Sequence, residues 1–215
     1  MTPPGVFHPI SDSWLRARVL CAQPQTRGGA VLDLCTGSGV LAVSAARCGA
    51  AEAGAVDVSR RAVAAVRLNA RLNGVRVRAL RGDLYAPVAG RRFDVIVSNP
   101  PYVPSATDAL PRRGLERAWD GGRTGRVLLD RIIEGAPAHL KPGGIVLLVH
   151  SDVIDLPGTV ALLEQGGLTV DTSVRREGPL GPLLSARRAL LEERGLLEPG
   201  QNHEELCVVR ARARH

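Results

Sequence analysis

Short apolar runs alternate with stretches of helical periodicity along most of the chain. The apolar runs are bounded by glycine, asparagine or charged residues, which is typical of short buried β-strands. The run nearest the middle of the chain is apolar almost throughout, so its strand is predicted to be central in a sheet. The runs that predict strands are residues 30–35, 53–58, 75–83, 92–99, 145–150, 168–174 and 204–213.

Between these runs, apolar residues recur three or four positions apart, which predicts amphipathic helices. Ser59 is placed to cap the N-terminus of one helix, and Gly49 to end the helix before it. The sequence KPGG at 141–144 predicts a turn, and residues 104–124 predict a polar loop. The predicted helices are residues 40–48, 60–73, a segment carrying Val127 to Ala136, and segments near 159–165 and 184–194.

Strands that alternate with helices predict an α/β fold built on a mostly parallel sheet. The length of 215 residues and the apolar share of 45% fit one domain with its own core. No apolar stretch approaches the ~18 residues that a membrane span needs. The N-terminus lacks the pattern of a secretory signal. We therefore expect a cytoplasmic protein without a membrane segment.

The four cysteines, at positions 21, 35, 48 and 207, form no C-x-x-C pair and have no histidine cluster beside them. This spacing argues against a metal site and against a disulfide framework. We therefore predict four free, largely buried thiols in a reducing compartment.

The net charge of +7 comes almost wholly from arginine, since Lys141 is the single lysine. A basic surface favours acidic partners such as RNA, DNA or a ribosome-associated protein. The arginines are spread along the chain with no dense tail. A solvated arginine surface is therefore favoured over a dedicated nucleic-acid patch.

Polar side chains stand at the ends of four consecutive predicted strands: Asp33, Asp57, Asp83 and Asn99. The carboxyl ends of parallel strands meet at one edge, and ligands bind there where the strand order reverses. The turn TGSG follows the first of these strands, and its glycines allow a close approach of backbone to ligand. It is neither a G-x-G-x-x-G fingerprint nor a P-loop.

Four motifs together, DLCTGSG, AVDVS, GDLY and NPPY, resemble those of class I S-adenosylmethionine-dependent methyltransferases. More narrowly, the chain resembles the HemK group of glutamine-N5 methyltransferases over nearly its whole length. The resemblance implies a Rossmann-like fold: a seven-stranded, mostly parallel sheet with the last strand antiparallel and helices on both faces. It also implies S-adenosylmethionine as cofactor and a methyltransferase domain over residues 30–215.

The resemblance carries cofactor contacts onto particular residues. Many relatives have glycine where Cys35 stands. The residues implied are Asp33, Cys35 and Gly37 at the methionine part, Asp57 at the ribose, Val58, Asp83 and Leu84 at the adenine, and Asn99, which is shared with the reaction site.

Residues 1–29 resemble a segment that caps the cofactor in short members of the group. Asp12 and Ser13 would contact the cofactor there, or cap the helix that begins after them, and both roles are compatible. The sequence LERAWDGGRTGR resembles the loop that follows the reaction site in this group. Its Glu116 and Asp120 would orient the loop or the substrate, with solvent exposure as the alternative.

The sequence SNPPYVPS at 98–105 fits a reaction at a planar nitrogen. Such a nitrogen is a poor nucleophile, so it needs positioning and acceptors for its N–H groups. Asn99 offers a side-chain carbonyl, Pro100 a backbone carbonyl and Tyr102 a flat face, while Pro100 and Pro101 fix the backbone in advance. A simple proline strand terminator is the alternative.

We therefore predict methylation of a glutamine amide in a protein such as a peptide chain release factor. The compact members of the group work with a small zinc-binding partner in eukaryotes and archaea, so an activator subunit is left open, and no metal site is expected in this chain. The competing hypotheses are adenine-N6 methylation of DNA or RNA, which needs base flipping in a duplex, a small-molecule methyltransferase, and a catalytically silent scaffold.

Overall fold

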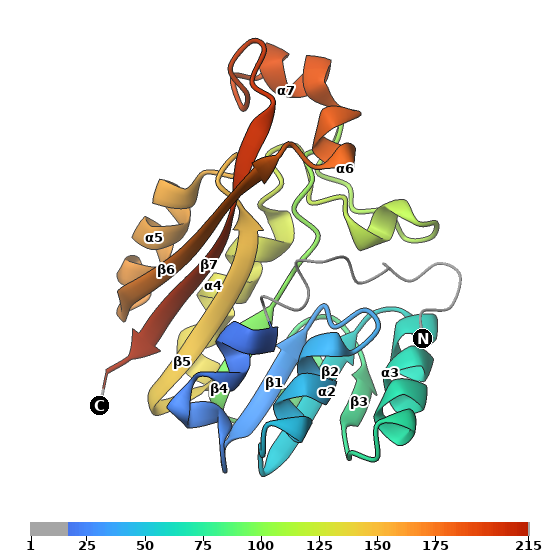
Figure 1. Cartoon of the computed structure of the whole chain (residues 1–215), viewed down its shortest axis with the longest axis vertical. Helices are drawn as coiled ribbons and strands as arrows, with labels where there is room; N and C mark the ends of the chain where they lie inside the picture. Colours follow the sequence, from blue (N-terminus) through green and yellow to red (C-terminus); the bar gives the residue numbers. More distant parts are fainter. Residues whose placement is uncertain (1–16, 215) are drawn as a thin grey trace.

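The computed structural model describes residues 17–214, which form one sheet with helices packed on it (Figure 1). The strand order is β3-β2-β1-β4-β5-β7-β6, and the order reverses between β1 and β4. The strands are β1 (Ala30–Leu34), β2 (Glu52–Asp57), β3 (Arg78–Arg81), β4 (Phe93–Ser98), β5 (Leu140–Ser151), β6 (Leu168–Pro179) and β7 (His203–Ala213).

Strands β1 to β5 pair in parallel, whereas β7 runs antiparallel to both β5 and β6. The predicted α/β fold, with its mostly parallel sheet and antiparallel last strand, is therefore confirmed. The helices are α2 (Val40–Arg47), α3 (Arg60–Leu72), α4 (Val127–His139), α5 (Leu156–Gln165), α6 (Pro182–Ser185) and α7 (Arg188–Glu193), with short 3₁₀ turns η1 (Pro24–Thr26), η2 (Ala86–Val88) and η3 (Glu116–Ala118).

Successive side chains of each strand point to opposite faces of the sheet, so each face has its own apolar surface. Different helices cover these two surfaces. On one face, Val31 of β1 packs with Leu41 of α2 and with Leu20 from the segment before β1. On the other face, Leu32 of β1 belongs to the cluster that includes Ile132 of α4. The residues just before β1 are thus part of the core, and the proposed division between residues 29 and 30 stays a prediction.

Two of the predicted helix signals work as expected. The Ser59 hydroxyl accepts a hydrogen bond from the Ala62 N–H, which caps α3. Gly49, with φ +90°, follows the end of α2. Gly39 has a second constraint besides its φ of +85°, since a Cβ there would lie 2.9 Å from the Val66 side chain. Glycine at this position lets α3 pack closely against the turn that opens α2.

Three expected boundaries differ in the structure. The predicted turn at 141–144 is wrong, because these residues lie inside β5, which begins with Leu140 paired to Phe93. The register then shifts before Val95 meets Ile145, and Gly143 takes up the irregularity with φ +71°. The predicted strand 75–83 shortens to β3, and the helix predicted near 184–194 is interrupted between α6 and α7.

The hairpin of β6 and β7 continues past the other strands and carries α6 and α7 above their carboxyl ends (Figure 1). Pairing continues to Pro179 opposite His203, and the Leu180 N–H donates to the Asn202 carbonyl at 2.8 Å. We call residues 180–202 the C-terminal cap. Because its base is closed by strand pairing, the cap is held over the edge of the sheet where a ligand is expected.

Cys21 and Cys48 are joined by a disulfide bond, so the prediction of four free thiols is wrong for this pair. Cys35 and Cys207 are free thiols. Cys21 ends the helical segment 17–21, and Cys48 is the C-cap of α2. The fold brings these two helix ends together, which a separation of 27 residues in the sequence does not reveal.

No helix among residues 17–214 is long and apolar enough to cross a membrane.

The disulfide should stabilise the fold by restricting the unfolded chain. For a loop of this length the contribution is ~3 kcal/mol. Reducing agent, or Cys48→Ser, should therefore lower the free energy of unfolding in urea by ~2–4 kcal/mol. Reducing agent should have no further effect on Cys48→Ser. An unchanged unfolding midpoint of the native chain after full reduction would contradict this assignment.

Candidate active site

A cavity of about 1060 Å³ lies at the carboxyl ends of β1, β2 and β4 and reaches the C-terminal cap. This is the place where the strand order reverses, as predicted for the ligand. Asp12 and Ser13 lie outside the described residues. The other predicted site residues all line the cavity: Asp33, Cys35, Gly37, Asp57, Val58, Asp83, Leu84, Asn99, Pro100, Pro101 and Tyr102.

Asp57 at the end of β2 holds the glycine-rich turn that follows β1. Its Oδ2 accepts a hydrogen bond from the Gly37 N–H at 3.0 Å, and its Oδ1 accepts one from the Ser59 N–H at 2.8 Å. Gly37 has φ +55°, and no atom lies within 4 Å of the position a Cβ would take. The turn is thus fixed in place while leaving open space beside its backbone.

Asp33 is almost fully buried, with 1% of its surface exposed. Its Oδ2 accepts hydrogen bonds from the Thr36 hydroxyl at 2.5 Å and from the Ala42 N–H at 3.1 Å. Burial raises the pKa of this carboxyl to about 7, against the opposing effect of those two hydrogen bonds. Asp33 therefore ties the end of β1 to the start of α2, and its contact with a cofactor stays a prediction.

Cys35 adopts a left-handed backbone conformation, with φ +54°. A non-glycine residue pays ~1–2 kcal/mol for this conformation. Glycine would adopt this conformation without that cost. Burial, first of all, raises the pKa of the Cys35 thiol, so the sulfur lines the cavity as a neutral, unreactive group.

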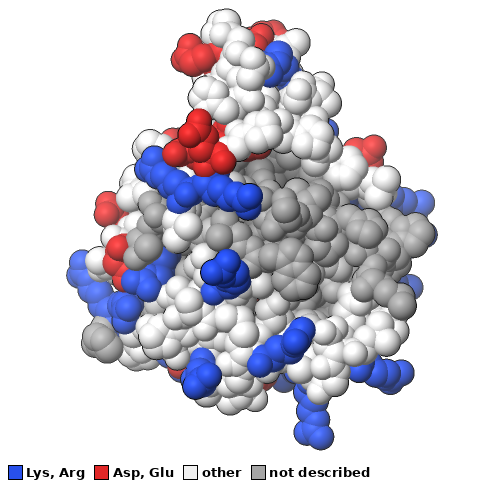
Figure 2. Space-filling model, in the orientation of Figure 1, with Lys and Arg blue, Asp and Glu red and all other residues white. Residues whose placement is uncertain are grey.

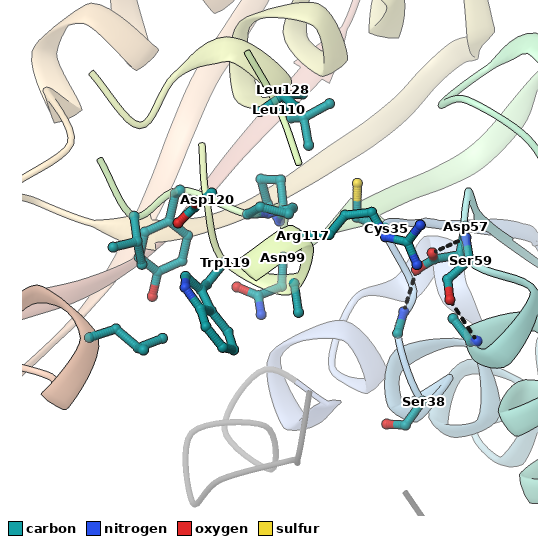
Figure 3. Close-up of a pocket in the computed structure, with 18 of the residues that line it drawn as sticks. Cys35, Ser38, Asp57, Ser59, Asn99, Leu110, Arg117, Trp119, Asp120 and Leu128 are labelled. Atoms are coloured by element: carbon teal, nitrogen blue, oxygen red, sulfur yellow. Dashed lines mark hydrogen bonds between the residues drawn. The ribbon is translucent and has the colours of Figure 1, made fainter. Parts of the chain in front are cut away.

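Arg117 of η3 points its guanidinium across the cavity toward Asp57 (Figure 3). Burial raises the pKa of Asp57, and the hydrogen bonds from Ser59 and Gly37 and the charge of Arg117 act in the opposite direction. No local pattern indicates this approach, because Arg117 is one arginine among many in a polar loop.

The predicted adenine side of the cavity has two different kinds of wall. Val58 is 42% exposed and lines the cavity, so a flat ligand could pack on its side chain. Asp83 forms an ion pair of 2.6 Å with Arg131 of α4, and both side chains are about half exposed. Leu84 beside it is buried and has φ +44°.

Asn99 follows the end of β4, and its Oδ1 is buried without a hydrogen-bond partner among the described residues. Pro100 and Pro101 are buried, and Tyr102 is half-buried. Figure 3 shows Asn99 and Trp119 side chains in the same part of the cavity. A buried acceptor without a donor costs ~1–3 kcal/mol, so a ligand that brings an N–H group is favoured here.

The loop after the reaction motif packs directly on it. The Val103 N–H donates to the Trp119 carbonyl at 2.7 Å, and the Gly121 N–H donates to the Val103 carbonyl at 2.9 Å. A Cβ at Gly121 would lie 2.8 Å from the Pro101 carbonyl oxygen, and a Cβ at Gly125 would collide with the backbone of Tyr102. Gly121 and Gly125 thus allow the backbone of the loop to pack directly on the backbone of the reaction motif.

Two arginines of the C-terminal cap hold this loop from the other side. Arg187 donates to the Pro104 carbonyl at 2.7 Å and forms an ion pair with Asp120, which is 8% exposed. Arg194 donates to the carbonyls of Ser105 and Arg123 at 2.8 and 2.7 Å. The hypothesis that Asp120 orients the loop is supported by this pair, whereas the Glu116 side chain is exposed.

Several lining residues were missed by reasoning from the sequence. Trp119 had a signal, because aromatic residues are scarce in this chain. The others had none: Arg117 is one arginine among many in a polar loop, and the place of the rest depends on how β6, β7 and the C-terminal cap fold. No group of three or more histidine, cysteine or acidic residues that would suit a metal occurs in the part of the chain described. The missed residues are Arg117, Trp119, Leu180, Leu183, Leu184 and Glu204.

Fold and site together define a methyltransferase of the Rossmann-like type, and residues 2–112 match the family described as Methyltransferase small domain. The chain belongs to this family. A protein of Methanocaldococcus jannaschii named as a protein N5-glutamine methyltransferase is 35% identical over 181 residues, covering 84% of this chain and 90% of the relative.

Other relatives carry similar names. The release factor glutamine methyltransferase of Bordetella pertussis is 41% identical and covers 77% of this chain, which spans only 63% of that relative. Methyltransferase HEMK2 of Mus musculus is 33% identical, with 75% of this chain and 85% of the mouse protein covered.

Solved structures support the fold. The ribosomal protein L11 methylase of Lactobacillus delbrueckii superposes with a TM-score of 0.64 at 21% identity, covering all of this chain and 84% of that one. A Thermus thermophilus 16S rRNA methyltransferase, solved with S-adenosylmethionine and guanosine, gives a TM-score of 0.61 at 23% identity, with 99% of this chain and 46% of that one covered.

The raised pKa of Asp33 predicts a pH-dependent contribution to stability. Because the folded-state pKa of about 7 lies above the ordinary value of 3.8, this contribution is full below pH ~4 and is lost as the pH rises toward ~7. Asp33→Asn does not titrate. Its free energy of unfolding, relative to the native chain, should therefore improve by ~2–4 kcal/mol between pH 4 and pH 7.

The comparison with the variant matters because His150 titrates in the same range with the opposite sign. Burial lowers the pKa of His150 to about 4 in the folded protein. The folded state therefore loses stability as the pH falls below ~6.5, because the unfolded chain binds the proton more readily. This effect is common to both proteins and cancels in the difference. A difference between the two proteins that stays constant with pH would contradict the raised pKa of Asp33.

Proposed function

We propose that this protein transfers a methyl group from S-adenosylmethionine to the side-chain amide nitrogen of a glutamine in a protein substrate. The observation that carries the proposal is the buried Oδ1 of Asn99, which lies in the cavity where the strand order reverses and has no hydrogen-bond partner in the described part of the chain. The names of the relatives in M. jannaschii and B. pertussis support the same chemistry.

The cavity fits the cofactor by its shape and donor set. The open space beside Gly37 allows the backbone turn to face the methionine part, with Asp33 and Cys35 in the wall behind it. The carboxylate of Asp57 can accept from ribose hydroxyls, as acidic residues at this strand end do in dinucleotide folds. Exposed Val58, with Asp83 and Leu84, offers a wall for the adenine ring.

When bound, S-adenosylmethionine supplies a methyl group on a positively charged sulfur that keeps the electron pair of the broken carbon–sulfur bond. In this proposal, Asn99 Oδ1 accepts one amide N–H of the glutamine, and the Pro100 carbonyl accepts the other. The side chains of Tyr102 and Trp119 form flat apolar walls beside that amide. These contacts orient the nitrogen for in-line attack, and it releases one proton to water after the new bond forms.

The substrate proposed is a peptide chain release factor or another protein of the translation machinery. Relatives are named for release factors and, in Bradyrhizobium diazoefficiens, for ribosomal protein uL3. An activator subunit and a cytoplasmic location remain predictions.

Adenine-N6 methylation remains the competing activity, because an adenine amino group is also planar. Labelled cofactor offered with release factor, with ribosomes and with nucleic acid in separate reactions distinguishes them, and mass spectrometry then locates the modified residue.

Removing the Asn99 amide should abolish transfer while sparing the cofactor site. Asn99→Ala should lower kcat by at least ~100-fold, because the acceptor for the reacting amide is lost. Its dissociation constant for S-adenosylmethionine should stay within about threefold of the native value, since the Asp57 side of the cavity is untouched. Calorimetry and single-turnover transfer measure the two effects. Equal loss of binding and transfer would contradict the role given to Asn99.

Asp57→Ala should have the opposite effect to Asn99→Ala, because its main loss should be in cofactor binding. Losing a buried hydrogen bond to the ribose weakens cofactor binding by ~1–3 kcal/mol. The variant also frees the Gly37 N–H, so Asp57→Asn, which keeps one acceptor, serves as the matched control with a smaller loss. Cofactor affinity that is the same in all three proteins would place the ribose elsewhere.

A further inference from the structure

The cavity is larger than one cofactor needs. Its volume of about 1060 Å³ lies above the range of ~300–1000 Å³ usual for a site that encloses one small ligand. It extends from the glycine-rich turn of β1, past the reaction motif, to the underside of the C-terminal cap. The part under the cap is therefore available to the molecule that receives the methyl group.

The walls under the cap are mostly apolar. Leu180, Leu184 and Leu206 are buried with at most 9% of their surface exposed, and Leu183 is half-buried. The cap cannot swing away freely, because Arg187 ties it to the loop after the reaction motif. A polar group beneath the C-terminal cap therefore meets little solvent, and it must find its hydrogen-bond partners in the protein or in a ligand.

Glu204, near the start of β7, is such a polar group in the cavity wall. Its Oε1 accepts a hydrogen bond from the Gly181 N–H at 2.7 Å, which fixes the orientation of the carboxylate. Its Oε2 is buried and has no hydrogen-bond partner among the described residues. Asn99 Oδ1 and Glu204 Oε2 are thus two buried acceptors in one cavity, and neither has a donor within residues 17–214.

We propose that Glu204 is a substrate-recognition residue whose Oε2 accepts a main-chain N–H of the peptide segment that carries the target glutamine. This inference rests on the proposed function and adds a second point of attachment to it. One acceptor would hold the side-chain amide, and the other would hold the backbone. Together they would select a glutamine presented in an extended peptide over a free amide.

A neutral main-chain N–H fits this place better than a cationic side chain. The leucine walls offer nothing to solvate an ammonium or guanidinium group. A hydrogen bond from an amide N–H to a carboxylate is charge-assisted and needs no further counter-ion. The part of the substrate peptide that lies between Asn99 and Glu204 would therefore be recognised through its main chain.

The variant Glu204→Gln tests the proposal. The carboxylate of Glu204 can accept from two N–H groups, that of Gly181 and that of the peptide. The amide of glutamine has one acceptor oxygen, so in either orientation its NH₂ group faces one of these two donors and one hydrogen bond is lost. With a glutamine-containing peptide from a release factor, we expect the KM to rise at least ~10-fold. The cofactor affinity and the kcat at saturating peptide should stay within about threefold. Glu205→Gln is the matched control, since Glu205 pairs with Arg175 and does not line the cavity.

Peptides N-methylated at one backbone position at a time identify the donor. One such peptide should raise the KM of the native enzyme as much as Glu204→Gln does, and the two changes combined should cost no more than either alone. An unchanged KM in Glu204→Gln, or additive losses for every peptide, would overturn this inference while leaving the proposed function intact. A native enzyme that modifies no glutamine in any peptide or release factor would overturn both.

Discussion

The hydrogen bond from the Ser98 hydroxyl to the Leu34 carbonyl, at 2.8 Å, joins the carboxyl ends of the two strands on which the site depends. Ser98 is fully buried and pairs in register with Leu34, so β1 and β4 end at the same level. The glycine-rich turn begins directly after Leu34, and Asn99 follows directly after Ser98. Because the strand order reverses here, the two segments diverge and leave a cavity between them. The pairing of two central strands thus sets the separation of the glycine-rich turn and Asn99.

Around this fixed edge, the rest of the cavity is built by contacts between segments distant in sequence. The loop after the reaction motif lies on the motif's backbone through Gly121 and Gly125, and the C-terminal cap holds the loop through Arg187 and Arg194. Figure 2 shows arginine and lysine side chains scattered over one face rather than gathered into a continuous patch, which fits a solvated arginine surface. The proposed recognition of the substrate rests on the cavity and on two buried acceptors, Asn99 Oδ1 and Glu204 Oε2, that have no hydrogen-bond partner among the described residues.

Local signals in the sequence predicted the central part of this structure well. The apolar runs predicted β1, β2, β4 and β5, Ser59 predicted the start of α3, and the polar strand ends predicted the edge where the cavity lies. Predictions went wrong where distant pairing decided the outcome. The turn expected at residues 141–144 lies within β5, which pairs with β4 at Leu140 before it and at Ile145 after it, and Cys21 met Cys48 because two helix ends converge. Arg187 contacts Pro104 across 83 positions of sequence, and no local pattern announces such a contact.

The central claim is that Asn99 holds a glutamine amide against the reacting methyl group at this edge of the sheet. A crystal structure of the enzyme with S-adenosylhomocysteine and a glutamine-containing release-factor peptide tests it most directly. The account predicts the amide nitrogen about 2.9 Å from Asn99 Oδ1 and facing the cofactor sulfur. A cofactor bound away from β1 and β2, or a glutamine amide out of reach of Asn99, would contradict it.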